Sequence, residues 1–130
     1  MEHGEPMKLY LAGPMTGIPQ FNFPAFEAAA VRLRNAGYEV VSPHETDHPK
    51  VQKAAWASRS GDVADLPRGL GGSDLLLTCH QNLEDVASCE GVALLDDWDR
   101  SKGVRFEIAT ADRLGIPVSP VEYWAYRVRA

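Results

Sequence analysis

The chain has 130 residues, of which 45% are hydrophobic and 24% are charged, and its formal net charge is -5 at pH 7. This length suits one domain over residues 1–130, and this composition is typical of a folded globular protein rather than a disordered or fibrous one. The acidic balance argues against a nucleic-acid polymer as partner, because such proteins need clustered Lys and Arg to displace counterions from phosphates.

The apolar runs of the sequence are all far shorter than the roughly 20 residues that cross a bilayer. Residues 1–7 lack the basic start and the apolar stretch of a secretion signal. We therefore expect a cytoplasmic protein without a membrane partner. In that compartment Cys79 and Cys89 are reduced thiols, and we expect both to be buried as small apolar residues.

The first half of the chain predicts a strand, a helix and a second strand. A β-rich run over 8–12 ends in a loop rich in Gly and Pro, and a helix follows from Pro24 until Gly37, which has the position of a C-cap glycine. A second short strand covers 38–42. Residues 44–72 lack a clear period, so we expect a long connection with a helical turn near 51–58.

The second half predicts two more helix and strand pairs. We expect helices over 73–88 and 102–114, strands over 91–95 and 116–121, and no regular structure over 122–130. Strands that are continuous apolar runs between helices indicate an α/β fold, in which a parallel sheet has helices on both faces. Ligands of such sheets bind at the carboxyl ends of the strands.

Among the loops at the carboxyl ends of the strands, the loop over 96–103 and the start of the helix after it contain the most side chains that could bind or react with a ligand. The hydroxyl of Ser101 and the amides behind it suit an anion such as phosphate, because a helix N-terminus favours negative charge. Glu107, about one turn into the helix, can lean back toward the same place and attack or stabilise an anomeric carbon. The alternative is that Ser101 only caps the helix and that Glu107 is an ordinary surface or ion-paired residue.

Residues 44–48 match the H-E-x-x-H pattern of zinc proteases. Pro43 and Pro49 bracket the five residues, and Thr46 and Asp47 are poor helix formers, so the two histidines are not expected on one helical turn. We predict a polar loop that faces the substrate, and no metal. A dinucleotide fingerprint is also absent, because G-x-G-x-x-G does not occur and Pro14 interrupts the turn.

Several aromatic residues have two interpretations. They either stack on a base or belong to the core, and the second is commoner for single aromatics in a domain of this size; they are Phe21, Phe23, Trp56 and Trp98. The aromatic end of the chain is a candidate contact with a neighbouring molecule; it contains Tyr123, Trp124 and Tyr126.

Three segments make the chain similar to a known group of enzymes. The run KLYLAGPMTG over 8–17, the pair Ser42-Pro43 and the run SKGVRFE over 101–107 resemble the nucleoside 2-deoxyribosyltransferase-like superfamily. The match is to its short members, which are related to the 2'-deoxynucleoside 5'-phosphate N-hydrolases. The resemblance implies a single flavodoxin-like (Rossmann-like) domain that acts on the N-glycosidic bond of a nucleoside or nucleoside 5'-monophosphate, as transferase or hydrolase.

The resemblance also implies roles for individual residues. Glu107 is the nucleophile, and Ser101 and Gly103 contact a phosphate; no metal or organic cofactor is implied. A homodimer or higher homo-oligomer is implied as well. The remaining substrate-binding residues expected on this basis are Gly13, Pro14, Met15, Thr16, Gly17, Phe23 and Pro43.

Two positions depart from the family pattern. Asn82 stands where the family has an Asp, and His80 stands where the short members often have Arg. Asn82 can hydrogen-bond a sugar or a base but cannot supply a proton. An acidic residue after the third strand would then have to supply the proton, and the candidates are Asp97 above all, or else Asp96 or Asp99. The alternative function is a nucleotide-binding or regulatory domain with weak or no turnover.

Overall fold

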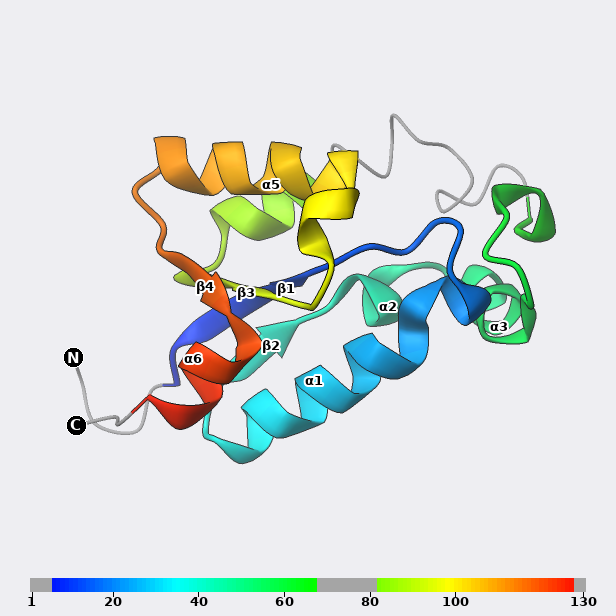
Figure 1. Cartoon of the computed structure of the whole chain (residues 1–130). Coiled ribbons are helices and arrows are strands. Elements are labelled where there is room, and N and C mark those ends of the chain that lie inside the picture. The colour runs from blue at the N-terminus through cyan, green and yellow to red at the C-terminus, as the bar shows by residue number, and fades with distance from the viewer. Residues whose placement is uncertain (1–5, 68–81, 128–130) are drawn as a thin grey trace.

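The computed structural model describes residues 6–67 and 82–127, and within them it forms a four-stranded parallel sheet in the order β2-β1-β3-β4 (Figure 1). The strands are β1 (Lys8–Ala12), β2 (Glu39–Val41), β3 (Gly91–Leu94) and β4 (Val118–Pro120). All three neighbouring pairs are parallel. The predicted α/β, flavodoxin-like fold is thus confirmed.

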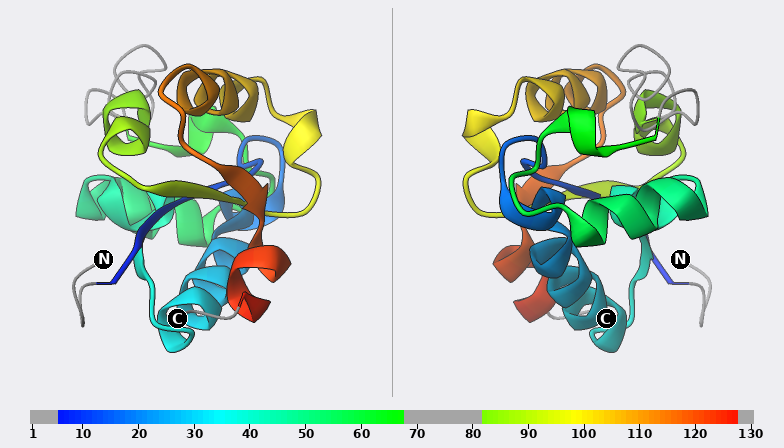
Figure 2. Two further views of the ribbon diagram at one scale, coloured as in Figure 1. Left: turned by 90° about the vertical axis from the view of Figure 1, so that its left-hand side faces the viewer. Right: turned by 90° about the vertical axis from the view of Figure 1, so that its right-hand side faces the viewer.

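Helices cover both faces of the sheet. Successive side chains of β1 point to opposite faces, so this apolar strand contributes to a core on each side. Leu9 and Leu11 face one core, which α1 (Phe23–Asn35) and α6 (Val121–Tyr126) close. Tyr10 and Ala12 face the opposite core, which α5 (Lys102–Arg113) and the helix over 82–87 close. Figure 2 shows these two layers from both ends of the sheet.

The first half of the chain confirms the predicted strand, helix and strand. Gly37 has a φ of 99°, the left-handed conformation that ends a helix at little cost for glycine. The connection before α1 holds a feature that the sequence did not indicate. The short 3-10 helix η1 (Pro19–Asn22) contains three successive left-handed residues that are not glycine, Gln20, Phe21 and Asn22.

The connection over 44–72 has more regular structure than we expected. It contains the single turn α2 (Pro43–Thr46), the helix α3 (Pro49–Ala57) and the 3-10 turn η2 (Val63–Asp65). The predicted turn near 51–58 therefore belongs to a helix that starts two residues earlier. Each helix has its proline in the first turn, where the missing N–H costs nothing, so Pro43 and Pro49 start helices instead of excluding them.

The prediction for the end of the chain was wrong. The strand β4 ends at Pro120, and Val121 begins α6. We expected Val121 to be the last residue of the strand and the residues after it to be irregular. A helix of six residues is too short to show a period. Trp124 is buried in the molecule's own core, where its indole donates to the carbonyl of Val92 (2.9 Å), so it is not an exposed contact for a neighbour.

Some predictions fall outside the described residues. These are the start of the helix over 73–88 and both Cys79 and His80; the described part of that helix covers 82–87. Cys89 is a free, buried cysteine, as expected. Among the helices of the described ranges, none combines the length and the apolar character that a bilayer crossing requires.

Candidate functional site

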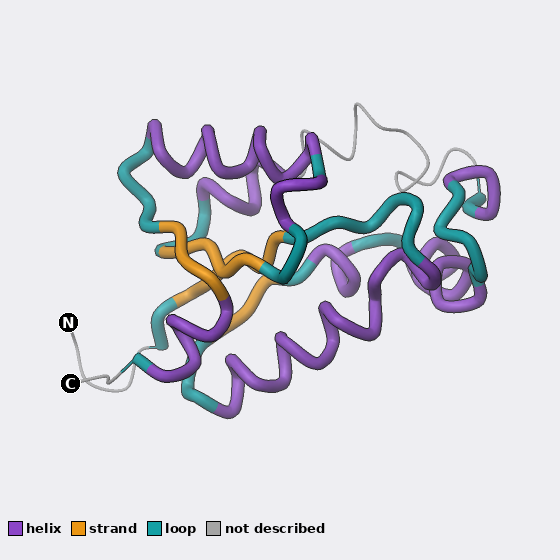
Figure 3. Tube along the Cα trace, viewed as in Figure 1, coloured by secondary structure: helices purple, strands orange, loops and turns teal. Residues whose placement is uncertain are grey.

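The candidate site lies where β1 and β3 end side by side. The chain leaves β1 toward α1 on one face of the sheet and leaves β3 toward α5 on the other, and Figure 3 shows the loops between them at one edge. Open α/β sheets bind ligands at this kind of topological switch point, where the connections after two neighbouring strands go to opposite faces of the sheet. The two loops touch: Leu95 N–H donates to the carbonyl of Ala12 (2.8 Å), and a Cβ on Gly13 would lie 2.7 Å from Leu95 Cδ1.

Glu107 is buried below that edge, on the side of α5 that faces the sheet. The residue is only 7% exposed, and the Tyr10 hydroxyl donates a hydrogen bond of 2.6 Å to Glu107 Oε2. Tyr10 comes from the middle of β1 and is itself fully buried. The interpretation of Glu107 as an ordinary surface or ion-paired helix residue is therefore wrong, because it is an inward-facing carboxyl group with a phenol as its partner.

Burial changes the acidity of both groups. It raises the pKa of Glu107 from 4.5 to about 7, although the hydrogen bond from Tyr10 acts in the opposite direction. Burial and the neighbouring Glu107 charge hold the pKa of Tyr10 well above its usual value. At neutral pH the pair therefore contains a Glu107 that exchanges readily between carboxylate and carboxylic acid, next to a tyrosine that keeps its proton.

Asp85 is a second carboxyl group on this face of the sheet. It belongs to the helix over 82–87, and its charge raises the pKa of both Glu107 and Tyr10. Its Oδ2 atom is buried and has no hydrogen-bond partner among residues 6–67 and 82–127, and burial raises the pKa of Asp85 itself. Sequence reasoning pointed to Asn82, one turn earlier on the same helix, and missed Asp85.

The N-terminus of α5 has the predicted cap. Ser101 accepts a hydrogen bond from the Val104 N–H (3.2 Å) through its side chain, and it remains half-buried. Gly103 is exposed, and the nearest atom to a Cβ added there is Ser101 Oγ at 3.7 Å. Packing within the chain does not require glycine at this position, and its small size leaves room above the first amides of the helix.

The loop after β1 is held in a strained conformation by its neighbours. Left-handed backbone is unfavourable for residues other than glycine. Here Gln20 N–H donates to Ser58 O (2.7 Å), and Asn22 Nδ2 donates to Pro14 O (2.9 Å). Of the five predicted residues in this loop, Gly13 and Pro14 are buried, Met15 is half-buried, and Thr16 and Gly17 are exposed.

Phe23 and Pro43 lie in the core beside this loop. Phe23 is 1% exposed and packs edge-on against the rings of His44 (5.7 Å) and Trp56 (5.6 Å). Pro43 is buried at the start of α2. Phe21 is buried too, while Trp56 and Trp98 are partly exposed. In this structure Phe23 and Pro43 thus belong to the packed interior beside the loop after β1.

The structure does not join Asn82 or Asp97 to Glu107. Within the described ranges, neither side chain has a hydrogen bond to that carboxyl group, whose partner is Tyr10. Asn82 is half-buried in its helix. Asp97 is exposed and left-handed (φ 61°) at the turn after β3. Asp97 therefore lies on the loop at the site's edge, open to solvent.

The H-E-x-x-H segment does not form a metal site in the described residues. His44 and His48 do not share a helix, because α2 ends at Thr46 and His48 caps α3 by accepting from Lys50 N–H. Arg34 binds both oxygens of Glu45 at 2.9 and 2.6 Å, so that carboxylate is already engaged. Across residues 6–67 and 82–127, His, Cys, Asp and Glu form no group of three that suits a metal ion.

A family model, described as domain of unknown function (DUF4406), matches residues 7–120. The chain belongs to the DUF4406 family. The match includes β1 with Tyr10, the loop after it and the whole of α5 with Glu107, so the DUF4406 region contains the complete candidate site. Neither the curated proteins nor the solved structures that were compared gave a match.

Sequence reasoning had found one half of the central pair. Glu107 was expected, whereas Tyr10 was quoted only as part of the opening run. The signal for it was a hydroxyl in the middle of an otherwise apolar strand, since a buried Tyr usually needs a hydrogen-bond partner. The sequence did not indicate which partner, because β1 and α5 are far apart along this DUF4406 chain.

Proposed function

We propose that this protein cleaves or transfers the N-glycosidic bond of a nucleoside or a nucleoside 5'-monophosphate, with Glu107 as nucleophile. The observation that supports this proposal best is the position of Glu107. It is buried beside the switch point between β1 and β3, and its carboxyl group accepts a hydrogen bond from the Tyr10 hydroxyl. A carboxyl group with a pKa near 7, beside a sheet edge that suits ligands, is characteristic of a reactive residue. The resemblance to the nucleoside 2-deoxyribosyltransferase-like superfamily supplies the substrate class.

The proposed reaction has two steps. A carboxylate oxygen of Glu107 bonds to C1' of the sugar while the C1'–N bond breaks, and the electron pair of that bond leaves with the base. The departing nitrogen takes a proton from a general acid, for which Asp97 or a water beside it is our candidate. Water, or the nitrogen of a second base, then attacks C1', releases Glu107 and gives up a proton.

Tyr10 would keep the nucleophile in place and tune it. As a hydrogen-bond donor it stabilises the ionised form of Glu107, which is the form that attacks, against the effect of burial. The hydrogen bond also holds Oε2 toward the sheet. Oε1, which has no hydrogen bond to any described residue, would then be the atom that bonds to C1'. Because its own pKa is high, Tyr10 stays a donor over the neutral range.

A phosphate on the substrate would lie at the N-terminus of α5. The first amides of the helix and the Ser101 hydroxyl are suitable donors, and the small Gly103 allows a ligand to come close. The acidic net charge of the chain does not conflict with this placement, because a single phosphate needs only local donors.

The test is to incubate the purified protein with a panel of nucleosides and nucleoside monophosphates and to measure free base by chromatography. We expect base release by the parent chain, loss of release in Glu107→Gln, and full release in Glu122→Gln, an exposed control. Saturable nucleotide binding without release by the parent would support the alternative, a binding or regulatory domain, which Asn82 in place of a family Asp favours.

A further inference from the structure

A turn over residues 58–62, which follows α3, lies against the loop that leaves β1. The N–H of Gly17 donates to the carbonyl of Gly61 (2.9 Å), and the N–H of Gln20 donates to the carbonyl of Ser58 (2.7 Å). Two backbone hydrogen bonds therefore join the turn to a loop that belongs to the candidate site.

The fit between the turn and the loop is close. Gly61 has a φ of 73°, and a Cβ added there would lie 2.2 Å from the carbonyl oxygen of Ile18. Both the backbone conformation and the neighbouring chain thus require glycine at this position. Phe21 of the loop is buried in the same small core as Val51 and Ala55 of α3. The helix and the turn after it together support the loop.

The conformation that the turn supports is unfavourable for the loop itself. Gln20, Phe21 and Asn22 have φ values of 57°, 51° and 62°. Residues with a Cβ are crowded in this left-handed region, and a run of them persists only where the surroundings fix it. Here Gln20 is held twice, because its N–H donates to Ser58 and its side-chain amide donates to the carbonyl of Trp56 (2.9 Å).

Ser58 is at the centre of the hydrogen bonds that fix the turn. It is only 4% exposed, and the proposed reaction does not use it. Its hydroxyl donates to Asp65 Oδ2 (2.7 Å) and accepts from the Gly61 N–H (3.0 Å). The hydroxyl of Ser60 donates to the same Asp65 oxygen (3.3 Å). Because Ser58 also supplies the carbonyl that binds Gln20, one buried residue connects the bonds within the turn to the loop.

We propose that Ser58 is a positioning residue of the candidate site, which holds the loop after β1 in the left-handed conformation that places residues 13–17 at the substrate. The effect reaches the site through Asn22, whose side-chain amide donates to the carbonyl of Pro14, the second residue after β1 (2.9 Å). Ser58 acts through this backbone and not by contact with the reacting atoms. The proposal rests on the proposed function only in that it takes this loop to bind the substrate.

Amide hydrogen exchange, followed by NMR, tests the positioning without any ligand. Ser58→Ala leaves the buried N–H of Gly61 without its acceptor and loosens the turn. Exchange at the amides of Gly17 and Gln20 should become roughly tenfold faster or more. The amide of Val92 in β3, which donates to Pro117, reports on unfolding of the sheet, and its exchange should change much less.

Asp65 offers a matched pair of variants at an exposed position, which leaves the buried core intact. Asp65→Ala removes the acceptor of the Ser58 hydroxyl, whereas Asp65→Asn keeps an oxygen there. Exchange at Gln20 should therefore be faster in the Ala variant and close to the parent's in the Asn variant. Restored protection by the conservative variant would show that the hydrogen bond, and not the bulk of the side chain, supports the turn.

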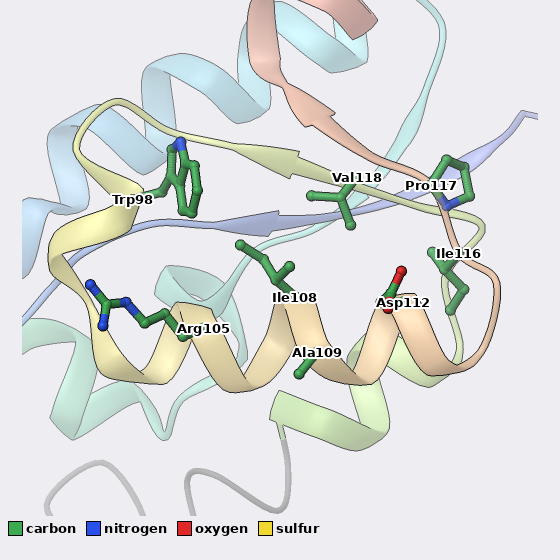
Figure 4. A pocket seen from close by; sticks show the side chains of 8 residues that line it. All are labelled: Trp98, Arg105, Ile108, Ala109, Asp112, Ile116, Pro117 and Val118. Carbon is green, nitrogen blue, oxygen red and sulfur yellow. The ribbon is translucent and has the colours of Figure 1, made fainter.

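Asp112→Ala is the control for the Asp65 variants. Asp112 is also an exposed aspartate, and it borders a pocket of about 480 Å³ between α5 and the segment that leads into β4 (Figure 4). β4 is the edge of the sheet opposite β2, which is the strand that leads into α2 and α3. This change should leave the exchange of the loop amides as it is in the parent.

Kinetics give a second measurement for any compound that the parent cleaves. Ser58→Ala should raise KM by roughly tenfold with kcat nearly unchanged, because a loosened loop binds the substrate less well. The NMR titration midpoint of Glu107 should stay in place, since Ser58 acts on the loop and not on that carboxyl group.

Three outcomes would overturn the proposal. They are unchanged exchange at Gly17 and Gln20 in Ser58→Ala, acceleration by one equal factor at these amides and at Val92, and an unchanged KM in a variant whose loop is loosened. A parent that releases no base would contradict the proposed function alone, because hydrogen exchange still decides whether Ser58 holds the loop.

Discussion

The hydroxyl of Tyr10 on β1 and the Oε2 atom of Glu107 on α5 lie 2.6 Å apart, and both side chains are buried. This contact fixes the helix to the sheet and fixes the carboxyl group to a donor. It also means that changes at one residue should appear in the titration of the other.

Replacing Glu107 with Gln should stabilise the protein at high pH. The pKa of Glu107 is about 7 in the folded chain and near 4.5 when exposed, so the folded state loses stability as pH rises from about 4.5 to about 7. The loss is roughly 3 kcal/mol when complete, and Gln avoids it. Urea unfolding should therefore show Glu107→Gln to be more stable than the parent by roughly 3 kcal/mol at pH 8. At pH 4 the two should be equal, and a gain of the same size at both pH values would contradict the assigned cause.

Replacing Tyr10 with Phe should raise the pKa of Glu107 further. The hydrogen bond from Tyr10 lowers that pKa, and its loss leaves burial without this compensation. Carbon-13 NMR of the glutamate carboxyl groups measures the change without substrate. If base release occurs, its kcat/KM should rise with pH through the Glu107 pKa, and the midpoint should move to higher pH in Tyr10→Phe. Tyr123→Phe, at an exposed tyrosine, is the control.

Replacing Asp85 with Asn should have the opposite effect. The charge of Asp85 raises the pKa of Glu107, so its removal should lower that pKa and move the same NMR midpoint to lower pH. Glu84→Gln removes a charge from the exposed side of the same helix and should leave the midpoint in place. Movement in the same direction as for Tyr10→Phe would show that Asp85 acts through packing and not through its charge.

Replacing Gly103 with Ala should separate stability from binding. A methyl group fits there without a close contact, and Ala is the better helix former, so stability should stay equal or rise by up to about 1 kcal/mol. If a phosphate binds at this end of α5, the methyl group should weaken the binding of nucleoside monophosphates more than that of nucleosides. Calorimetric titration with both compounds measures this difference, and equal affinities for variant and parent would place the phosphate elsewhere.

Replacing Gly13 with Ala should destabilise the fold. The new Cβ would lie 2.7 to 3.0 Å from three side-chain atoms of Leu95, so a cost of about 1–3 kcal/mol is expected from overpacking. Adding Leu95→Ala removes the nearest obstacle, and the double variant should lose less stability than the sum of the two single losses. Additive losses in urea unfolding would mean that the two loops do not press against each other.

The sequence by itself determined the α/β class, the ends of β1 and the helix with its cap at Ser101, and it predicted Glu107 as a site residue. These are local properties, because apolar runs, caps and turn residues act within a few positions of one another. It could not decide the partner of Glu107, the helices over 43–57 or the helix after Pro120. Short helices have no period, and their stability comes from packing, as the buried Trp124 shows.

Only the tertiary structure decided that Tyr10 and Asp85 belong with Glu107, and that Phe23 lies in the core below the loop after β1. The pKa of a carboxyl group depends on which groups surround it and on how completely water is excluded, and both follow from contacts between distant segments. The pocket between α5 and the segment that leads into β4 has the same origin, because its lining residues come together only when α5 packs beside β4.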